Sequence, residues 1–145
     1  MTRAARGLFV AIAVLSLAGI AVSSVSLYHH FQTSKTDYCE FGQAFNCDIV
    51  NRSVYSTIFG IPVALIGILG YAGIGVLATL YRDRTDTPKV LLGASLAGLG
   101  FALYLTYIEG FVLGTWCILC LSSLTVIVLI TILATFLMAQ SMRRA

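Results

Sequence analysis

The sequence predicts an all-α integral membrane protein, a bundle of four transmembrane helices, from its composition and from the spacing of its charges. Of the 145 residues, 59% are hydrophobic and only 10% are charged, whereas about a quarter of the residues of a soluble domain are charged. The charged residues divide the chain into four long apolar runs. Because helices satisfy their own backbone hydrogen bonds in lipid, each run is expected to form one.

The four predicted helices and the longest loop between them form one membrane domain over residues 1–145. The helices cover residues 8–28, 58–81, 90–108 and about 115–140, and the loop covers residues 29–57. Each apolar run has at least roughly 19 uncharged residues, enough to cross about 30 Å of hydrocarbon at a rise of 1.5 Å per residue. The first run is longer than the hydrophobic region of a signal peptide, which favours a retained helix over a cleaved leader.

Proline and small residues indicate where these helices begin and how they pack. Pro62 falls near the start of the second helix, where its missing N–H costs least. Several small residues of the second and third helices suit close helix–helix approach in lipid, and we expect them to serve packing only. They are Gly67, Gly70, Gly73, Gly93, Ala94, Ala97 and Gly98.

The basic residues predict the orientation of the bundle. Most of them lie before the first helix, between the second and third, or after the fourth: Arg3, Arg6, Arg82, Arg84, Lys89, Arg143 and Arg144. With four helices these three segments share one side, and the positive-inside rule makes that side cytoplasmic. We therefore expect a multi-pass protein of the cell inner or plasma membrane, with both termini cytoplasmic and residues 29–57 extracytoplasmic.

The long loop carries too many apolar side chains for a solvated linker. Asn46 is a candidate N-cap for a short helix that runs to about Ser53. Such a segment would lie on the membrane surface or cover the mouth of the bundle. Glu109, in contrast, is expected to be a solvated residue of the short loop between the third and fourth helices.

All four cysteines fall on the predicted extracytoplasmic side. Cys39 and Cys47 lie in the long loop, while Cys117 and Cys120 form a Cys-Ile-Leu-Cys motif in the outer turns of the fourth helix. Residues three apart share one face of a helix, and the dipole at a helix N-terminus stabilises the thiolate that attacks disulfides. Thr115 is a candidate cap there. The pattern favours a redox relay.

Other interpretations of the cysteines stay open. Two structural disulfides are one; a closed zinc site is another, although the spacing of the loop pair is atypical for zinc. Four inert thiols would be expected to scatter over all the helices. A relay also needs an electron acceptor, and the sequence has no Gly-rich dinucleotide motif. A lipid-soluble quinone, which takes two electrons and two protons, could reach the second pair from the outer leaflet.

Composition also bears on the other classes of function. The sequence has no basic stripe with interleaved aromatic residues, so nucleic acid is not an expected partner. Coupled transporters carry ionisable groups within the membrane, and the predicted helices contain no Asp, Glu, Lys or Arg. A membrane scaffold or transporter with structural disulfides stays the non-enzymatic alternative.

The segments that carry the cysteines resemble those of the vitamin K epoxide reductase family, including its bacterial and archaeal branch. They are Cys39-Glu-Phe-Gly-Gln-Ala-Phe-Asn-Cys47, Ser53, Ser-Thr-Ile-Phe-Gly at 56–60 and Cys117-Ile-Leu-Cys120. The resemblance covers about residues 8–140. It implies a four-helix bundle around a quinone, menaquinone or ubiquinone, with the extracytoplasmic loop and its short helix capping the pocket.

The resemblance also implies roles for individual residues. Cys39 would meet an external thiol partner, and Cys47 would pass electrons to Cys117. Cys120 would lie nearest the quinone, and no metal is implied. The positions implied to contact the quinone are Ser53, Tyr55, Ser56, Phe59 and Leu124.

Two residues depart from the pattern of the animal enzymes. Leu124 stands where those enzymes have a Tyr that contacts the quinone carbonyl, and Tyr55 stands where they have a Trp. Both departures favour a bacterial-type thiol:quinone oxidoreductase that oxidises a thioredoxin-fold dithiol protein of the DsbA type. Reduction of vitamin K quinone or epoxide stays the alternative. Because the sequence ends at Ala145, we expect the thioredoxin-fold partner to be a separate chain. We also expect the enzyme to be a monomer.

Overall fold

The computed structural model describes residues 3–31, 57–114, 116 and 118–144, and of residues 29–31 only the backbone. Its helices are α1 (Arg3–Phe31), α3 (Val63–Thr79), α4 (Thr87–Tyr107) and α5 (Ile118–Arg144), with a π-helix, η3 (Ile108–Leu113), continuing α4. Two short strands, β1 (Thr57–Ile58) and β2 (Ile61–Pro62), pair as a hairpin. The predicted all-α class is confirmed.

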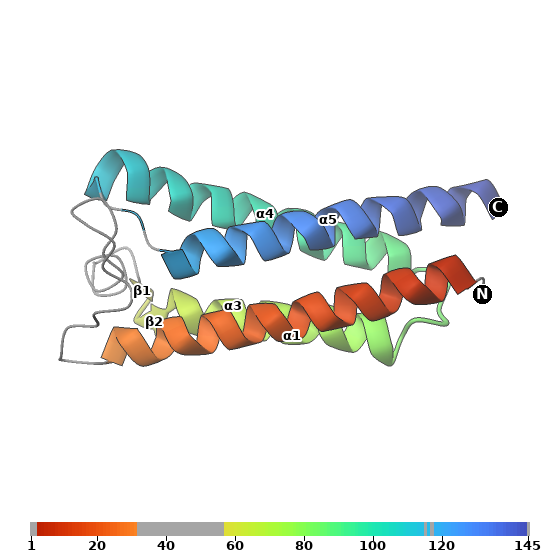
Figure 1. The fold of residues 1–145 in the computed structure, drawn as a ribbon, viewed down its shortest axis with the longest axis horizontal. Helices are drawn as coiled ribbons and strands as arrows, with labels where there is room; N and C mark the ends of the chain where they lie inside the picture. The colour runs from red at the N-terminus through yellow and green to blue at the C-terminus, as the bar shows by residue number, and fades with distance from the viewer. Residues whose placement is uncertain (1–2, 32–56, 115, 117, 145) are drawn as a thin grey trace.

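The helices lie side by side along one long axis, and consecutive helices run in opposite directions (Figure 1). Three of them, counting α4 with η3 as one, are long and apolar enough to cross a membrane, and α3 is shorter, at 17 residues. Both termini and the α3–α4 turn lie at one end of the bundle, here called the terminal end. The hairpin, η3 and the start of α5 lie at the other, the cysteine end.

The helix predicted to begin at residue 58 begins instead at Val63. Residues 57–62 form the hairpin, in which Ile58 pairs with Ile61. Phe59 and Gly60 at its tip have φ of 53° and 79°, and positive φ at both central residues is typical of a type I′ turn. Pro62 follows with extended backbone and lacks an N–H, so the helix begins at the next residue. The predicted place of Pro62, at the start of this helix, is confirmed.

The prediction that Glu109 is a solvated loop residue is wrong. The third helix continues past residue 108 as η3, and Glu109 is buried, with 1% of its surface exposed. A π-helix has a wider turn than an α-helix, which changes the side chains that face the bundle. Gly114 ends η3 in the left-handed conformation, φ 66°, and its N–H bonds to the carbonyl of Glu109.

The hydrophobic core fills the half of the bundle nearer the terminal end. It draws buried side chains from all four helices, among them Ile12, Ile74, Leu91 and Ile130. The helices are packed tightly at this end, so the space for a ligand lies toward the cysteine end.

Candidate active site

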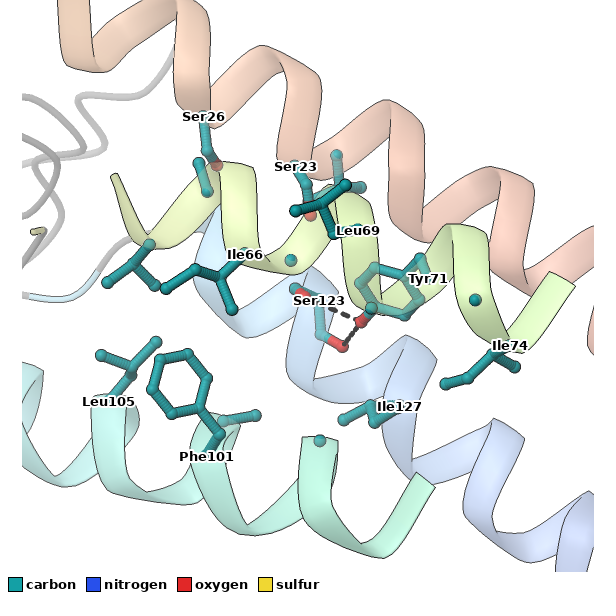
Figure 2. A pocket seen from close by; sticks show the side chains of 18 of the residues that line it. Ser23, Ser26, Ile66, Leu69, Tyr71, Ile74, Phe101, Leu105, Ser123 and Ile127 are labelled. Carbon is teal, nitrogen blue, oxygen red and sulfur yellow. Dashed lines mark hydrogen bonds between the residues drawn. The ribbon is translucent and has the colours of Figure 1, made fainter. Parts of the chain in front are cut away.

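A cavity of about 460 Å³ opens within the half of the bundle nearer the cysteine end. Cavities of about 300–1,000 Å³ are typical of small-molecule sites. Most of its lining is apolar, with Ile66 of α3 facing Phe101 and Leu105 of α4 (Figure 2). The polar or sulfur-bearing side chains of the lining are few: Ser23, Ser26, Tyr71, Cys120 and Ser123. Such a cavity suits a flat apolar molecule with a small number of polar atoms.

Cys120 lines this cavity from the first turn of α5 and is half-buried. The start of α5 is held near the end of η3, because the ring of Trp116 packs on Gly110. A Cβ at Gly110 would lie 2.8 Å from that ring, so only glycine leaves room for it. Close contact between Trp116 and η3 thus positions the turn that carries Cys120.

A pair of hydrogen-bonded hydroxyl groups joins α3 to α5 in the wall of the cavity. The hydroxyl of Tyr71 lies 2.8 Å from Ser123 Oγ and donates to the Ser123 carbonyl at 2.9 Å (Figure 2). Ser123 lies three residues after Cys120, on the same side of α5, and both line the cavity. Cys120 and the hydroxyl pair therefore line one and the same cavity.

The ring of Tyr71 packs against the backbone of α1. A Cβ at Gly19 would lie 2.5 Å from two carbon atoms of this ring, so the ring lies flat against bare backbone. Neither Tyr71 nor Ser123 was predicted from the sequence to belong to the site. A signal was present, because a Tyr in the middle of an apolar run has to find a partner for its hydroxyl, and Tyr is otherwise enriched at membrane interfaces.

The cavity also reaches the outer surface of the bundle along α3. Gly70 and Gly73 belong to its lining and are exposed, and a Cβ at either would meet nothing within 4 Å. The expectation that these two glycines serve helix packing is wrong. It is confirmed for Gly67, where a Cβ would lie 2.9 Å from Ser23 Oγ of α1. The two exposed glycines leave a lateral opening toward the surface that lipid would cover.

The structure describes only part of the predicted site. Cys120 lines the cavity, whereas Leu124 packs against the core and is not part of the lining. Phe59 lies at the tip of the hairpin with its side chain fully exposed. The remaining predicted residues lie outside the described residues: Cys39, Cys47, Cys117, Ser53, Tyr55 and Ser56.

Replacing Phe59 by Asn is expected to raise thermal stability slightly. Left-handed backbone costs a residue with a Cβ about 1–2 kcal/mol, and Asn adopts it more readily than Phe. Because Phe59 is fully exposed, the substitution removes little packing. The measurement is the unfolding midpoint in detergent. A loss of quinone affinity in this variant would show instead that Phe59 reaches the ligand, as the sequence predicts.

A bundle of apolar helices long enough to cross lipid defines a multi-pass membrane protein, and a cysteine in the wall of its cavity is a candidate redox group. A comparison with protein-family models agrees: the model described as "Vitamin K epoxide reductase family" matches residues 10–135, most of the chain. The chain belongs to that family. Members are membrane oxidoreductases and use quinones, so a membrane redox function is supported for this chain.

Proposed function

We propose that this protein is a thiol:quinone oxidoreductase that removes electrons from an extracytoplasmic thioredoxin-fold dithiol protein and delivers them to a membrane quinone, which supports disulfide formation. The observation that carries the proposal is the position of Cys120, a cysteine in the wall of an apolar cavity whose lining reaches the exposed surface of α3. A soluble acceptor would have no need of such a site, whereas a lipid-soluble one reaches it through the bilayer.

The cavity fits a quinone by its volume and by its lining. About 460 Å³ accommodates a ring system with the first part of a prenyl chain. The ring would pack against Ile66, Phe101 and Leu105. The hydroxyl groups of Tyr71 and Ser123 would contact a polar atom of the ring. When bound, a quinone supplies an acceptor for two electrons and two protons.

The proposed relay consists of successive thiol–disulfide exchanges. A thiolate of the partner attacks the Cys39–Cys47 disulfide, and its second thiol resolves the mixed disulfide, so the partner is oxidised and the loop pair is reduced. The loop dithiol then reduces the Cys117–Cys120 disulfide through Cys47 and Cys117 in the same way. Each exchange moves one electron pair, and the second leaves Cys117 and Cys120 as a dithiol.

The proposal is tested by reconstitution in liposomes with a reduced thioredoxin-fold protein and a quinone. We expect two thiols of the partner to be lost for each quinone reduced, measured by thiol titration and by quinone absorbance. Offering vitamin K epoxide with a small dithiol instead tests the alternative, and we expect no turnover of it. If the purified protein reduces no quinone with any dithiol, the proposal is wrong.

The lateral opening is tested by replacing Gly73 with Leu. The new side chain meets no atom at its Cβ and would extend into the opening, so we expect quinone turnover to fall about tenfold or more with little change in the unfolding midpoint. Gly93→Leu is the matched control, because Gly93 is a helical glycine on α4 with equal free space and does not line the cavity. Equal turnover in both variants would contradict entry at this place.

A further inference from the structure

We propose that Tyr71 and Ser123 together form the hydrogen-bonding site for a carbonyl oxygen of the quinone ring. This inference rests on the proposed function and names two residues for which neither the cysteine motif nor the resemblance gave a role. Tyr71 is buried, with 6% of its surface exposed, and Ser123 is half-buried. Both lie in the wall of the cavity, which is otherwise mostly apolar.

Ser123 differs from its neighbours on α5 in the partner of its hydroxyl. Several hydroxyl side chains of this helix donate to the carbonyl one turn earlier in the chain: Ser122, Thr125, Thr131 and Thr135. Such a bond satisfies the hydroxyl within its own helix. Among the described residues, the Ser123 hydroxyl bonds instead with Tyr71 across the cavity. The two hydroxyl groups therefore lie in the wall of the cavity, where one of them can donate a hydrogen bond to a ligand.

The pair can supply one donor to a ligand and still keep one internal hydrogen bond. It has two hydroxyl protons, and three oxygen atoms can accept them: the Tyr71 phenol oxygen, Ser123 Oγ and the Ser123 carbonyl. If the Ser123 hydroxyl turns toward the cavity, the Tyr71 hydroxyl still donates to Ser123. When a carbonyl binds, the hydrogen bond from the Ser123 hydroxyl to Tyr71 is lost, and a hydrogen bond from Ser123 to the carbonyl replaces it.

The spacing on α5 brings this donor close to the thiol. Cys120 and Ser123 are three residues apart, which places their Cβ atoms about 5–6 Å from each other. A quinone ring with one edge against Cys120 therefore has an adjacent edge within reach of the Ser123 hydroxyl. A donor at a carbonyl oxygen also stabilises the negative charge that develops there as electrons arrive, most effectively where water is excluded.

The test measures binding without turnover. The probes are 2,3-dimethyl-1,4-naphthoquinone, detected by quenching of Trp116, the single Trp of the chain, and 2,3-dimethylnaphthalene, detected by competition with it. The second probe has the same shape without the carbonyl groups. Tyr71→Phe and Ser123→Ala are each expected to raise the Kd of the quinone about fivefold, the value of one neutral hydrogen bond. The affinity for the hydrocarbon stays the same.

Ser122→Ala is the matched control, because it removes a hydroxyl from the next residue of α5 that does not line the cavity. It is expected to leave both affinities unchanged. Equal quinone affinity in wild type, Tyr71→Phe and Ser123→Ala would overturn the inference. So would an equal loss for both probes, which indicates a structural role only, and so would a wild-type protein that binds no quinone.

The same preparations separate this inference from the proposed function. Hydroxyl-dependent quinone binding without oxidation of a thioredoxin-fold dithiol would refute the proposed function and leave the carbonyl site in place. Thiol-dependent quinone reduction with unchanged kcat and KM for quinone in both hydroxyl variants would refute the carbonyl site and leave the proposed function in place.

Discussion

Cys120→Ala is expected to abolish quinone reduction, lowering its rate by at least about a thousandfold, because no second group can replace a lost nucleophile. Among the described residues, Cys120 is the cysteine that lies in the wall of the cavity. Without it, Cys117 has no disulfide through which to accept an electron pair from the loop dithiol, so the relay stops before the acceptor.

The fold of the Cys120→Ala variant is expected to stay intact. The side chain is half-buried, so losing one sulfur atom removes little packing, and the unfolding midpoint in detergent should stay close to that of wild type. The variant should still bind 2,3-dimethyl-1,4-naphthoquinone, since Tyr71, Ser123 and the apolar lining remain. Quinone reduction at the wild-type rate would refute the assignment of Cys120.

The disulfides that form in the Cys120→Ala variant test the earlier steps of the relay. With Cys120 removed, a single turnover with reduced partner and no quinone should still oxidise partner thiols through the loop pair, if Cys39 and Cys47 act as proposed. Rapid quenching with a thiol-blocking reagent followed by mass mapping measures this. In the same variant without partner, Cys117 can attack the Cys39–Cys47 disulfide with Cys39 as the leaving thiolate. The expected Cys47–Cys117 disulfide then persists, because Cys120 is not present to release it.

Gly19→Ala is expected to destabilise the protein strongly and to weaken quinone binding. The added Cβ would lie 2.5 Å from the Tyr71 ring, far inside contact distance, and the ring is held on its other side by two hydrogen bonds to Ser123. Overpacking of this kind costs about 1–3 kcal/mol. It exceeds the gain of up to about 1 kcal/mol that Ala normally gives over Gly in a helix.

Gly7→Ala is the matched control for this prediction. Gly7 lies in the same helix, and a Cβ there meets nothing within 4 Å, so the substitution should be neutral or slightly stabilising. The measurements are the unfolding midpoint and the Kd for 2,3-dimethyl-1,4-naphthoquinone. An unchanged midpoint in Gly19→Ala would show that α1 and α3 do not pack as closely as the structure describes.

A double substitution isolates the contact between Gly19 and Tyr71. If the clash with the ring is the cause, Gly19→Ala should cost much less stability when Tyr71 is already Leu, whereas Tyr71→Phe should give no relief because the ring remains. The difference between the two backgrounds is the coupling free energy of the pair. Additive effects would place the cause elsewhere in α1.

Composition and charge spacing determined the class of this protein and most of its helices. Apolar runs long enough to cross lipid can hardly form anything but helices, so α1, α4 and α5 lie close to their predicted ranges. The residues at which helices begin and end are harder to predict from such runs. The start of α3 moved to Val63 because Phe59 and Gly60 form a turn, and Glu109 is buried because the helix continues as η3.

The sequence alone also identified Cys120 as a candidate for the site, since a Cys-x-x-Cys pair at a helix start is a local feature. The cavity beside it is a property of three dimensions. Gly70 and Gly73 appear in the sequence like any packing glycine, and only the arrangement of the helices shows that they line an opening. The Tyr71–Ser123 pair joins residues that lie far apart in the chain. No periodicity records such a contact, because it depends on how α1, α3 and α5 are packed against one another.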